Sequence, residues 1–295
     1  MLALSSWRRS PLVFLATLAA INWFGFAAWS ALLNNFAKES ISFSGFDMGV
    51  LQSIREVPGL LAVTALVWLY LMREQTLALV SLGALGIGVA LTGYMPTREG
   101  LWLTTFIMSV GFHYYETMNQ SLALQLLSKA EAPVALGRIA SVSAAAQLAA
   151  FGSIAALWTI WPNYSIWFLV AGGIAFTATV ASAVLFPRFE GPVVQRKGLV
   201  LRRRYWLYYA LTLMSGARRQ IFMAFGAFML VEMFGFGVSS IAILFLITYG
   251  INMVAAPMLG GLIARWGERA TIRFENISLI IVFVGYAAAA AGVLP

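Results

Sequence analysis

The stretch PLVFLATLAAINWFGFAAWSALL, from Pro11 to Leu33, runs for 23 residues without a charged side chain. A helix rises about 1.5 Å per residue, so about 20 apolar residues cross the hydrocarbon core of a bilayer. Eight further stretches of comparable character follow along the chain. They lack the alternation of apolar and polar residues that marks barrel strands, and they therefore predict an all-α, polytopic membrane protein.

The nine predicted transmembrane helices leave little of the chain for anything else. They run approximately over residues 11–33, 46–72, 77–94, 101–127, 137–160, 165–186, 205–233, 238–264 and 272–294. Of the 295 residues, 61% are hydrophobic and 10% are charged, whereas a soluble domain carries about 25% charged residues. This composition excludes a soluble globular protein and a disordered one.

Lysine and arginine are distributed unevenly over the predicted loops. If the N-terminus lies inside the cell, the inside loops hold 14 of these residues and the outside loops hold only Lys38 and Arg98. Because cytoplasmic loops are enriched in Lys and Arg, we expect a cytoplasmic N-terminus, in a bacterial inner membrane. The net charge of +8 is then mostly an orientation signal, and we expect the lipid bilayer as a partner and no nucleic acid.

One predicted loop has the composition of a linker. Residues 188–204 contain proline, glycine and several basic residues, among them Arg196 and Lys197. The predicted organisation is a six-helix N-terminal half at 1–187, a cytoplasmic basic linker at 188–204, and a partial C-terminal half of three helices at 205–295.

This layout resembles the major facilitator superfamily, in which two six-helix halves are joined by a basic cytoplasmic loop. The loop after the eighth helix reads GGLIARWGER, from Gly260 to Arg269. It is similar to the family's signature G-x-L-a-D-R-x-G-r, although Ala264 stands at the aspartate position and Glu268 at a basic one. The equivalent loop of the first half carries no signature. The residues that match, to which the resemblance gives a gating role, are Gly260, Arg265, Gly267 and Arg269.

The resemblance implies a secondary transporter that moves a small solute by alternating access. The family normally has twelve helices, so this chain lacks the counterpart of the last three. We expect a fragment or truncated product of such a transporter. The alternative is a non-transporting membrane scaffold or a relic of a transporter.

Charged side chains inside a bilayer are costly and mark functional sites. Arg218 and Arg219 lie about 20 Å along the seventh helix from Tyr205, too deep to reach the inner surface easily. By the resemblance, the first, fourth, seventh and tenth helices line the solute cavity. We therefore expect Arg218, Arg219 and the adjacent Gln220 to bind an anionic solute, with one arginine making a bidentate contact. The alternative is that both arginines are structural.

The fourth helix carries a polar stripe in which His113, Glu116, Thr117 and Gln120 share one face. Glu116 is the expected partner of Arg218 or Arg219 and a substrate-binding candidate. Asn22 of the first helix joins it as a residue that faces the cavity. His113 and Glu116 form either a proton-coupling pair or a fixed ion pair beside a neutral histidine, and both interpretations stay open.

The second helix contains Arg55 and Glu56 followed by Pro58 and Gly59. The proline and glycine predict a kink, and a gating or packing role is expected for the charged pair. We also expect Asn34 and Asn35 to end the first helix. One histidine and no cysteine argue against a metal-dependent enzyme, so no catalytic residue, metal or cofactor is expected.

Overall fold

The computed structural model describes residues 7–128, 131–189 and 202–290. Within the helices, only the backbone is described for residues 133, 212, 215, 217–224, 252, 254–265, 268, 289 and 290. Every regular element in the described ranges is a helix, which confirms the all-α prediction.

The first six predicted helices have the following bounds: α2 (Pro11–Ile41), α3 (Gly45–Leu60), α5 (Glu74–Thr92), α6 (Arg98–Leu126), α7 (Ala132–Leu157) and α8 (Tyr164–Leu185). Helix α3 continues through a 3-10 turn, η1 (Leu61–Thr64), into the short α4 (Ala65–Trp68). The last three are α9 (Trp206–Phe234), which follows the 3-10 turn η2 (Arg203–Tyr205), then α10 (Val238–Trp266) and α11 (Glu268–Ala290).

Among the described residues, six helices are long and apolar enough to cross a membrane: α2, α3 with its continuation, α5, α7, α8 and α11. Helix α6 is not among them because its polar stripe lowers its mean hydropathy. Helices α9 and α10 contribute shorter apolar segments, Phe225–Phe234 and Val238–Ile251, within their described parts. The chain is a multi-pass membrane protein.

Local sequence signals fix several helix ends. The Ser10 hydroxyl accepts a hydrogen bond from the Val13 amide, with Pro11 in the first turn of α2. Ser44 and Asp47 form a reciprocal capping box at the start of α3. Gly267 has φ +79°, in the left-handed region that favours glycine, and it makes the turn between α10 and α11.

The prediction that Asn34 and Asn35 end the first helix is wrong. Helix α2 continues to Ile41 and is closed by Ser42 in a left-handed conformation. Phe36 and Ala37 are 2% and 0% exposed, so contacts with neighbouring helices hold two further turns that polarity alone does not predict. Both asparagines are buried inside the helix.

The first six helices pack closely because glycines face neighbouring backbones. Helix α5 contacts α6 and α8, and α2 contacts α7, α8, α5 and α6. Gly88 lies against the backbone of Met108, and Gly111 lies against the backbone of Leu85. Without a hydrophobic force between helices in lipid, such close approach is a main source of packing energy.

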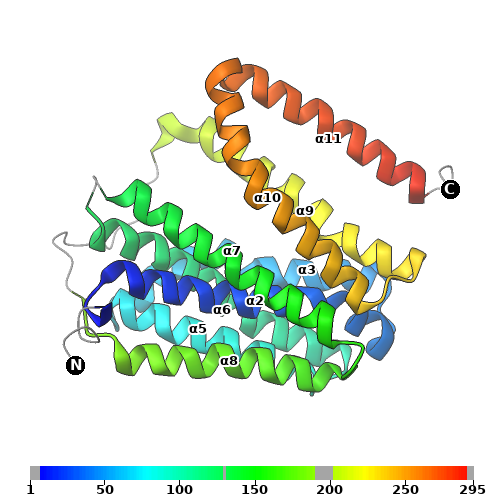
Figure 1. Ribbon diagram of the computed structural model, residues 1–295, viewed down its shortest axis with the longest axis horizontal. Helices are drawn as coiled ribbons and strands as arrows, with labels where there is room; N and C mark the ends of the chain where they lie inside the picture. The colour runs from blue at the N-terminus through cyan, green and yellow to red at the C-terminus, as the bar shows by residue number, and fades with distance from the viewer. Residues whose placement is uncertain (1–6, 129–130, 190–201, 291–295) are drawn as a thin grey trace.

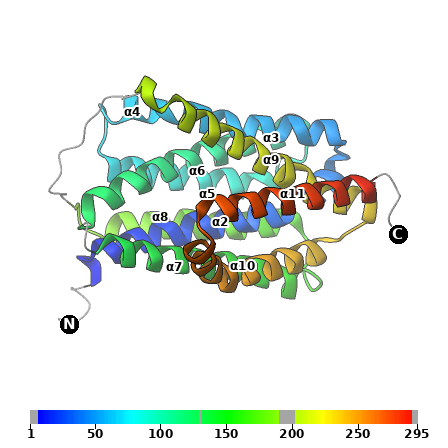
Figure 2. The same cartoon turned by 90° about the horizontal axis from the view of Figure 1, so that it is seen from above.

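The last three helices lie on one side of this bundle (Figure 1). Helix α9 contacts α3 and α2, while α10 contacts α7 and α2, and α11 contacts α10. Figure 2 shows α9 along α3 and α10 along α7, with α2 between them. Toward one end, α9 and α10 approach the first six helices, and toward the other end their ribbons diverge from them.

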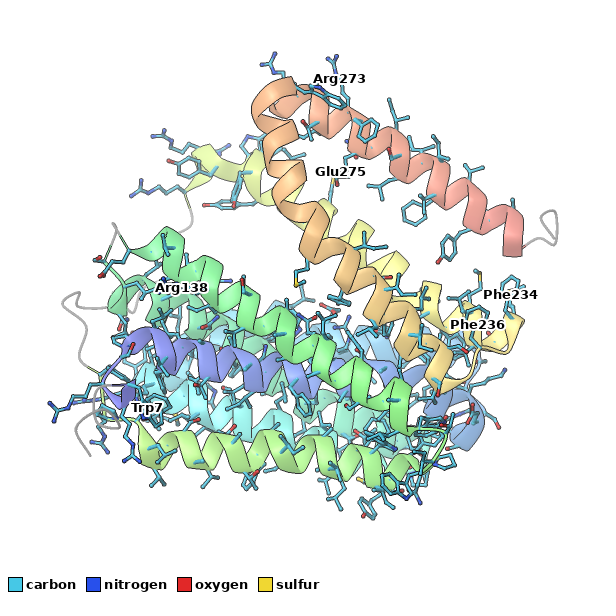
Figure 3. All side chains as sticks on the ribbon, viewed as in Figure 1. Trp7, Arg138, Phe234, Phe236, Arg273 and Glu275 are labelled. Atoms are coloured by element: carbon cyan, nitrogen blue, oxygen red, sulfur yellow. The ribbon has the colours of Figure 1, made fainter. Side chains whose placement is uncertain are left out.

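Labelled residues identify these two ends in Figure 3. Trp7 and Arg138 mark the end where the ribbons diverge, here named the Trp7 end. Phe234 and Phe236 mark the opposite end, here named the Phe236 end. A cavity of about 530 Å³ lies at the Phe236 end between α9 and α11. Its lining is apolar: Met229, Leu230, Phe234, Phe236, Val282, Gly285 and Tyr286.

Candidate functional site

The structure joins two of the predicted site residues directly. The Asn22 side-chain amide of α2 donates a hydrogen bond to Glu116 Oε1 of α6, at 3.0 Å. Asn22 is fully buried, and its Oδ1 atom has no hydrogen-bond partner. A carboxyl group held by a neutral amide, beside an unused acceptor, is a hydrogen-bonding unit with spare capacity for a solute or a proton.

Aromatic rings lie along the helices beside this pair. Trp23 and Phe112 meet edge to face, with centroids 5.6 Å apart, and Phe26 lies 4.6 Å from Phe112. Trp23 and Phe112 are half-buried. The α2–α6 interface therefore combines one carboxyl, one amide and ring surfaces, which suits a small organic solute with both polar and apolar parts.

His113 belongs to a different interface, between α6 and α3. Its imidazole fills the space beside Gly59, where an added Cβ would lie 2.9 Å from the ring. Arg55 and Glu56 are the charged groups that act on it. The contacts of His113 thus lead to α3, whereas the hydrogen bond of Glu116 leads to α2.

Arg55 and Glu56 form an ion pair of 2.6 Å, and Arg55 is 7% exposed. The Arg55 side chain also donates to Gln52, and the Ser109 hydroxyl donates to the Arg55 carbonyl. The helix then gives way to η1 after Pro58 and Gly59. The predicted kink is confirmed, and the charged pair lies immediately before it.

The side chains of Arg218, Arg219 and Gln220 lie outside the described residues, although α9 is helical throughout this region. Gly260 and Arg265 of the signature also lie where only the backbone of α10 is described. Of the other two signature residues, Gly267 makes the α10–α11 turn, and Arg269 is exposed at the start of α11.

A second polar group at the Phe236 end links the two sets of helices. The Asn35 amide donates to the Phe236 carbonyl at 2.7 Å, and Lys38 pairs with Glu232 of α9 at 3.0 Å. Gly235, with φ +66°, ends α9 and turns the chain toward α10, so Phe236 lies beside Asn35.

Sequence reasoning missed these contacts. Lys38 was predicted only as an outside loop residue, and Asn35 as a helix end. The sequence feature that indicates such contacts is the pair Asn34 and Asn35 in an apolar helix, because a buried polar side chain needs a hydrogen-bond partner.

Among the described residues, no group of three or more His, Asp or Glu side chains is placed to hold a metal ion. The site offers hydrogen bonds, one carboxyl and ring surfaces.

Comparison with known proteins was informative only at the level of structure. No family model and no curated protein matches the sequence. The nucleoside transporter NupG is similar, with a TM-score of 0.67 and 14% identity, over 87% of this chain and 68% of that one. A bacterial homologue of the human lysosomal transporter Spinster, in an inward-facing and unoccupied conformation, gives a TM-score of 0.69 and 14% identity, over 89% of this chain and 64% of that one.

The same Spinster homologue in an inward-facing and occupied conformation gives a TM-score of 0.65, and this chain spans 62% of its length. NupG and the Spinster homologue are both major facilitator transporters. The resemblance seen in the sequence is therefore confirmed for the fold, since the chain folds like these transporters over 87–89% of its length.

Proposed function

We propose that this chain acts in secondary transport, moving a small solute across a bacterial inner membrane by alternating access, with its N-terminus in the cytoplasm. The observation that carries the proposal is the Asn22–Glu116 pair, a half-buried carboxyl group held by a buried amide whose own oxygen has no hydrogen-bond partner. Polar groups at this depth in a membrane protein are expensive unless they serve a function.

The uneven contacts between the two sets of helices support alternating access. Polar contacts join α2 to α9 at the Phe236 end. Phe151 of α7 packs on Phe245 and Tyr249 of α10, also in the part of α10 nearer that end. Toward the Trp7 end the ribbons diverge (Figure 1). In this proposal residues 1–187 and 205–295 move as two units about the solute site, and the arrangement is the one open toward the cytoplasm.

The solute in this proposal carries an anionic group. Arg218 and Arg219 occupy the middle of α9, the helix that contacts α2 and α3. One guanidinium group binds the anion, while Asn22 and Glu116 bind a polar part of the same solute and Gln220 adds a further amide. Arg55 and Glu56, next to the break in α3, contribute to gating.

Uptake of organic anions into proteoliposomes tests the role of the arginines. Arg218→Ala and Arg219→Ala are compared with Arg273→Ala, which removes an exposed arginine of α11. The proposal expects at least about a tenfold loss of uptake in one of the two α9 variants, which corresponds to one charge-assisted contact, and none in the control. Equal uptake in all three variants would remove the arginines from the mechanism.

Proton coupling through His113 or Glu116 needs a separate experiment. Glu116→Gln and His113→Gln are assayed for uptake driven by a pH gradient and for exchange of solute without a gradient. A coupling residue loses the first and keeps the second, whereas a structural residue loses or keeps both. The scaffold alternative predicts no flux of any solute through a chain that remains folded.

A further inference from the structure

The segment that leads into α9 combines three arginines with four aromatic side chains. Arg202, Arg203 and Arg204 are all exposed. Tyr205, Trp206, Tyr208 and Tyr209 follow, with exposed fractions of 41%, 65%, 67% and 37%. We refer to residues 202–209 as the α9 entry segment. Each residue from 202 to 209 is exposed, so among the described residues no neighbouring helix covers this segment.

The backbone of this segment folds back on itself. The amide of Arg202 donates to the Tyr209 hydroxyl at 3.4 Å, across the turn η2. The guanidinium group of Arg204 lies 5.0 Å from the centre of the Tyr205 ring. Among the described residues, no carboxylate pairs with Arg202, Arg203 or Arg204. Three positive charges are thus gathered on one exposed turn without a described acidic partner.

The position of the segment indicates what it meets. It lies toward the Trp7 end, at the point where an apolar helix begins, and α9 has diverged there from the first six helices (Figure 1). Tyrosine and tryptophan concentrate at the level of lipid headgroups. Arginine binds phosphate through two parallel N–H groups, and basic residues beside a membrane helix attract anionic lipids.

We propose that the α9 entry segment binds the phosphate diester of an anionic lipid in the leaflet at the Trp7 end. The arginines contact the phosphate, and the aromatic rings lie against the glycerol and the upper part of the acyl chains. Such a lipid fixes the free end of α9. The proposal rests on membrane insertion alone and stands whether or not the chain transports a solute.

The test is native mass spectrometry of the full chain in detergent, titrated with phosphatidylglycerol or phosphatidylcholine. Each arginine near an anionic surface strengthens binding about fivefold. Replacing all three (Arg202→Gln, Arg203→Gln, Arg204→Gln) should weaken phosphatidylglycerol binding by at least about tenfold, and phosphatidylcholine binding by less, because phosphatidylcholine has the same phosphate diester but no net charge. The control removes three charges at the same end (Arg8→Gln, Arg9→Gln, Arg138→Gln).

Two further arms separate the possible sources of phosphate and the possible causes of a loss. Soluble glycerophosphate should not compete, because it lacks the acyl chains that the rings contact. The triple lysine variant keeps the charge and should bind more weakly than the native chain but more strongly than the glutamine variant. Equal losses in the glutamine and control variants, or effective competition by glycerophosphate, would overturn the proposal.

Discussion

The first six helices and the last three use glycine in opposite ways. In the first six, Gly86, Gly88, Gly111 and Gly172 each lie against the backbone of a neighbouring helix. In the last three, the glycines whose surroundings are described meet no atom within 4 Å of an added Cβ: Gly216, Gly235, Gly237, Gly250, Gly267 and Gly285. One part is a closely packed unit, and the other is attached to it by contacts nearer one end.

Helix α9 shows the same difference within a single element. Phe228 and Val231, in its second half, are 2% and 7% exposed. Trp206 and Met214, in its first half, are 65% and 70% exposed. Packed protein interiors switch between discrete arrangements and do not deform continuously. A compact unit joined to a second unit near one end can therefore rock against it as a rigid body. We therefore expect the glycine contacts to stabilise the first six helices, and the contacts at the Phe236 end to change when the two parts of the molecule move.

The largest effect is expected where the packed unit is broken. Gly172 of α8 faces the backbone of Gly86 and Ala90 in α5, whereas the adjacent Gly173 faces open space. Gly172→Leu should reduce the yield of monodisperse protein by at least about tenfold, because the two helices can no longer approach each other. Gly173→Leu, measured by the same size-exclusion profile, should behave as the native chain. Equal losses would mean that glycine packing is not what holds the first six helices.

A smaller loss is expected from the ion pair inside this unit. Arg55→Leu leaves the half-buried Glu56 without its partner near the break in α3 and removes the side-chain hydrogen bond to Gln52, a loss of about 1–3 kcal/mol. Arg98→Leu is the comparison, since Arg98 is 52% exposed and 3.4 Å from Asp47, and the Asp47 carboxylate keeps its hydrogen bonds from Ser44 when Arg98 is removed. Thermal unfolding in detergent should show a clear drop for the first variant and little change for the second. A larger drop in unfolding temperature for Arg98→Leu than for Arg55→Leu would contradict the proposed contribution of the Arg55–Glu56 pair to the stability of α3.

A still smaller effect is expected from reversing a charge at the Phe236 end. Lys38 and Glu232 are 39% and 33% exposed, so solvent screening limits their interaction to well under about 1 kcal/mol. Lys38→Glu should raise the open fraction at this end a few-fold, and Lys38→Glu combined with Glu232→Lys should restore it. Labelling of a cysteine introduced at Val231, which is 7% exposed, reports the opening. A double variant as reactive as the single one would show that the ion pair does not hold the end closed.

The weakest predicted effect concerns Asn35. Asn35→Ala removes one interhelical hydrogen bond, and such bonds contribute about 0.6 kcal/mol on average in membranes. Reactivity at Val231→Cys should therefore rise about two- to threefold. Ser30→Ala is the control, because the Ser30 hydroxyl bonds only within its own helix, to Ala27. No difference between the two variants would remove Asn35 from the contact.

The sequence predicted the helices well because bilayer thickness and apolar length are directly related. It also predicted the end of regular α-helix shortly after Pro58. It did not predict that Asn22 is the partner of Glu116, or that His113 lies toward α3, because these depend on how helices far apart in sequence are rotated. The length of α2 beyond Asn35 had the same cause, because the hydrogen bond from Asn35 to the Phe236 carbonyl, just after α9, is not visible in α2 alone.

The most direct test of the account measures both ends of the molecule at once. Because the chain has no cysteine, spin labels are introduced without background at exposed positions. Trp161→Cys with Met233→Cys reports the Phe236 end and leaves the Lys38–Glu232 pair intact, and Arg138→Cys with Tyr208→Cys reports the Trp7 end. Distances are measured in bilayers by double electron–electron resonance, with and without Asn35→Ala. Alternating access predicts that Asn35→Ala lengthens the distance at the Phe236 end and shortens the distance at the Trp7 end. The same fraction of molecules should show both changes. A change at one end with none at the other would contradict it.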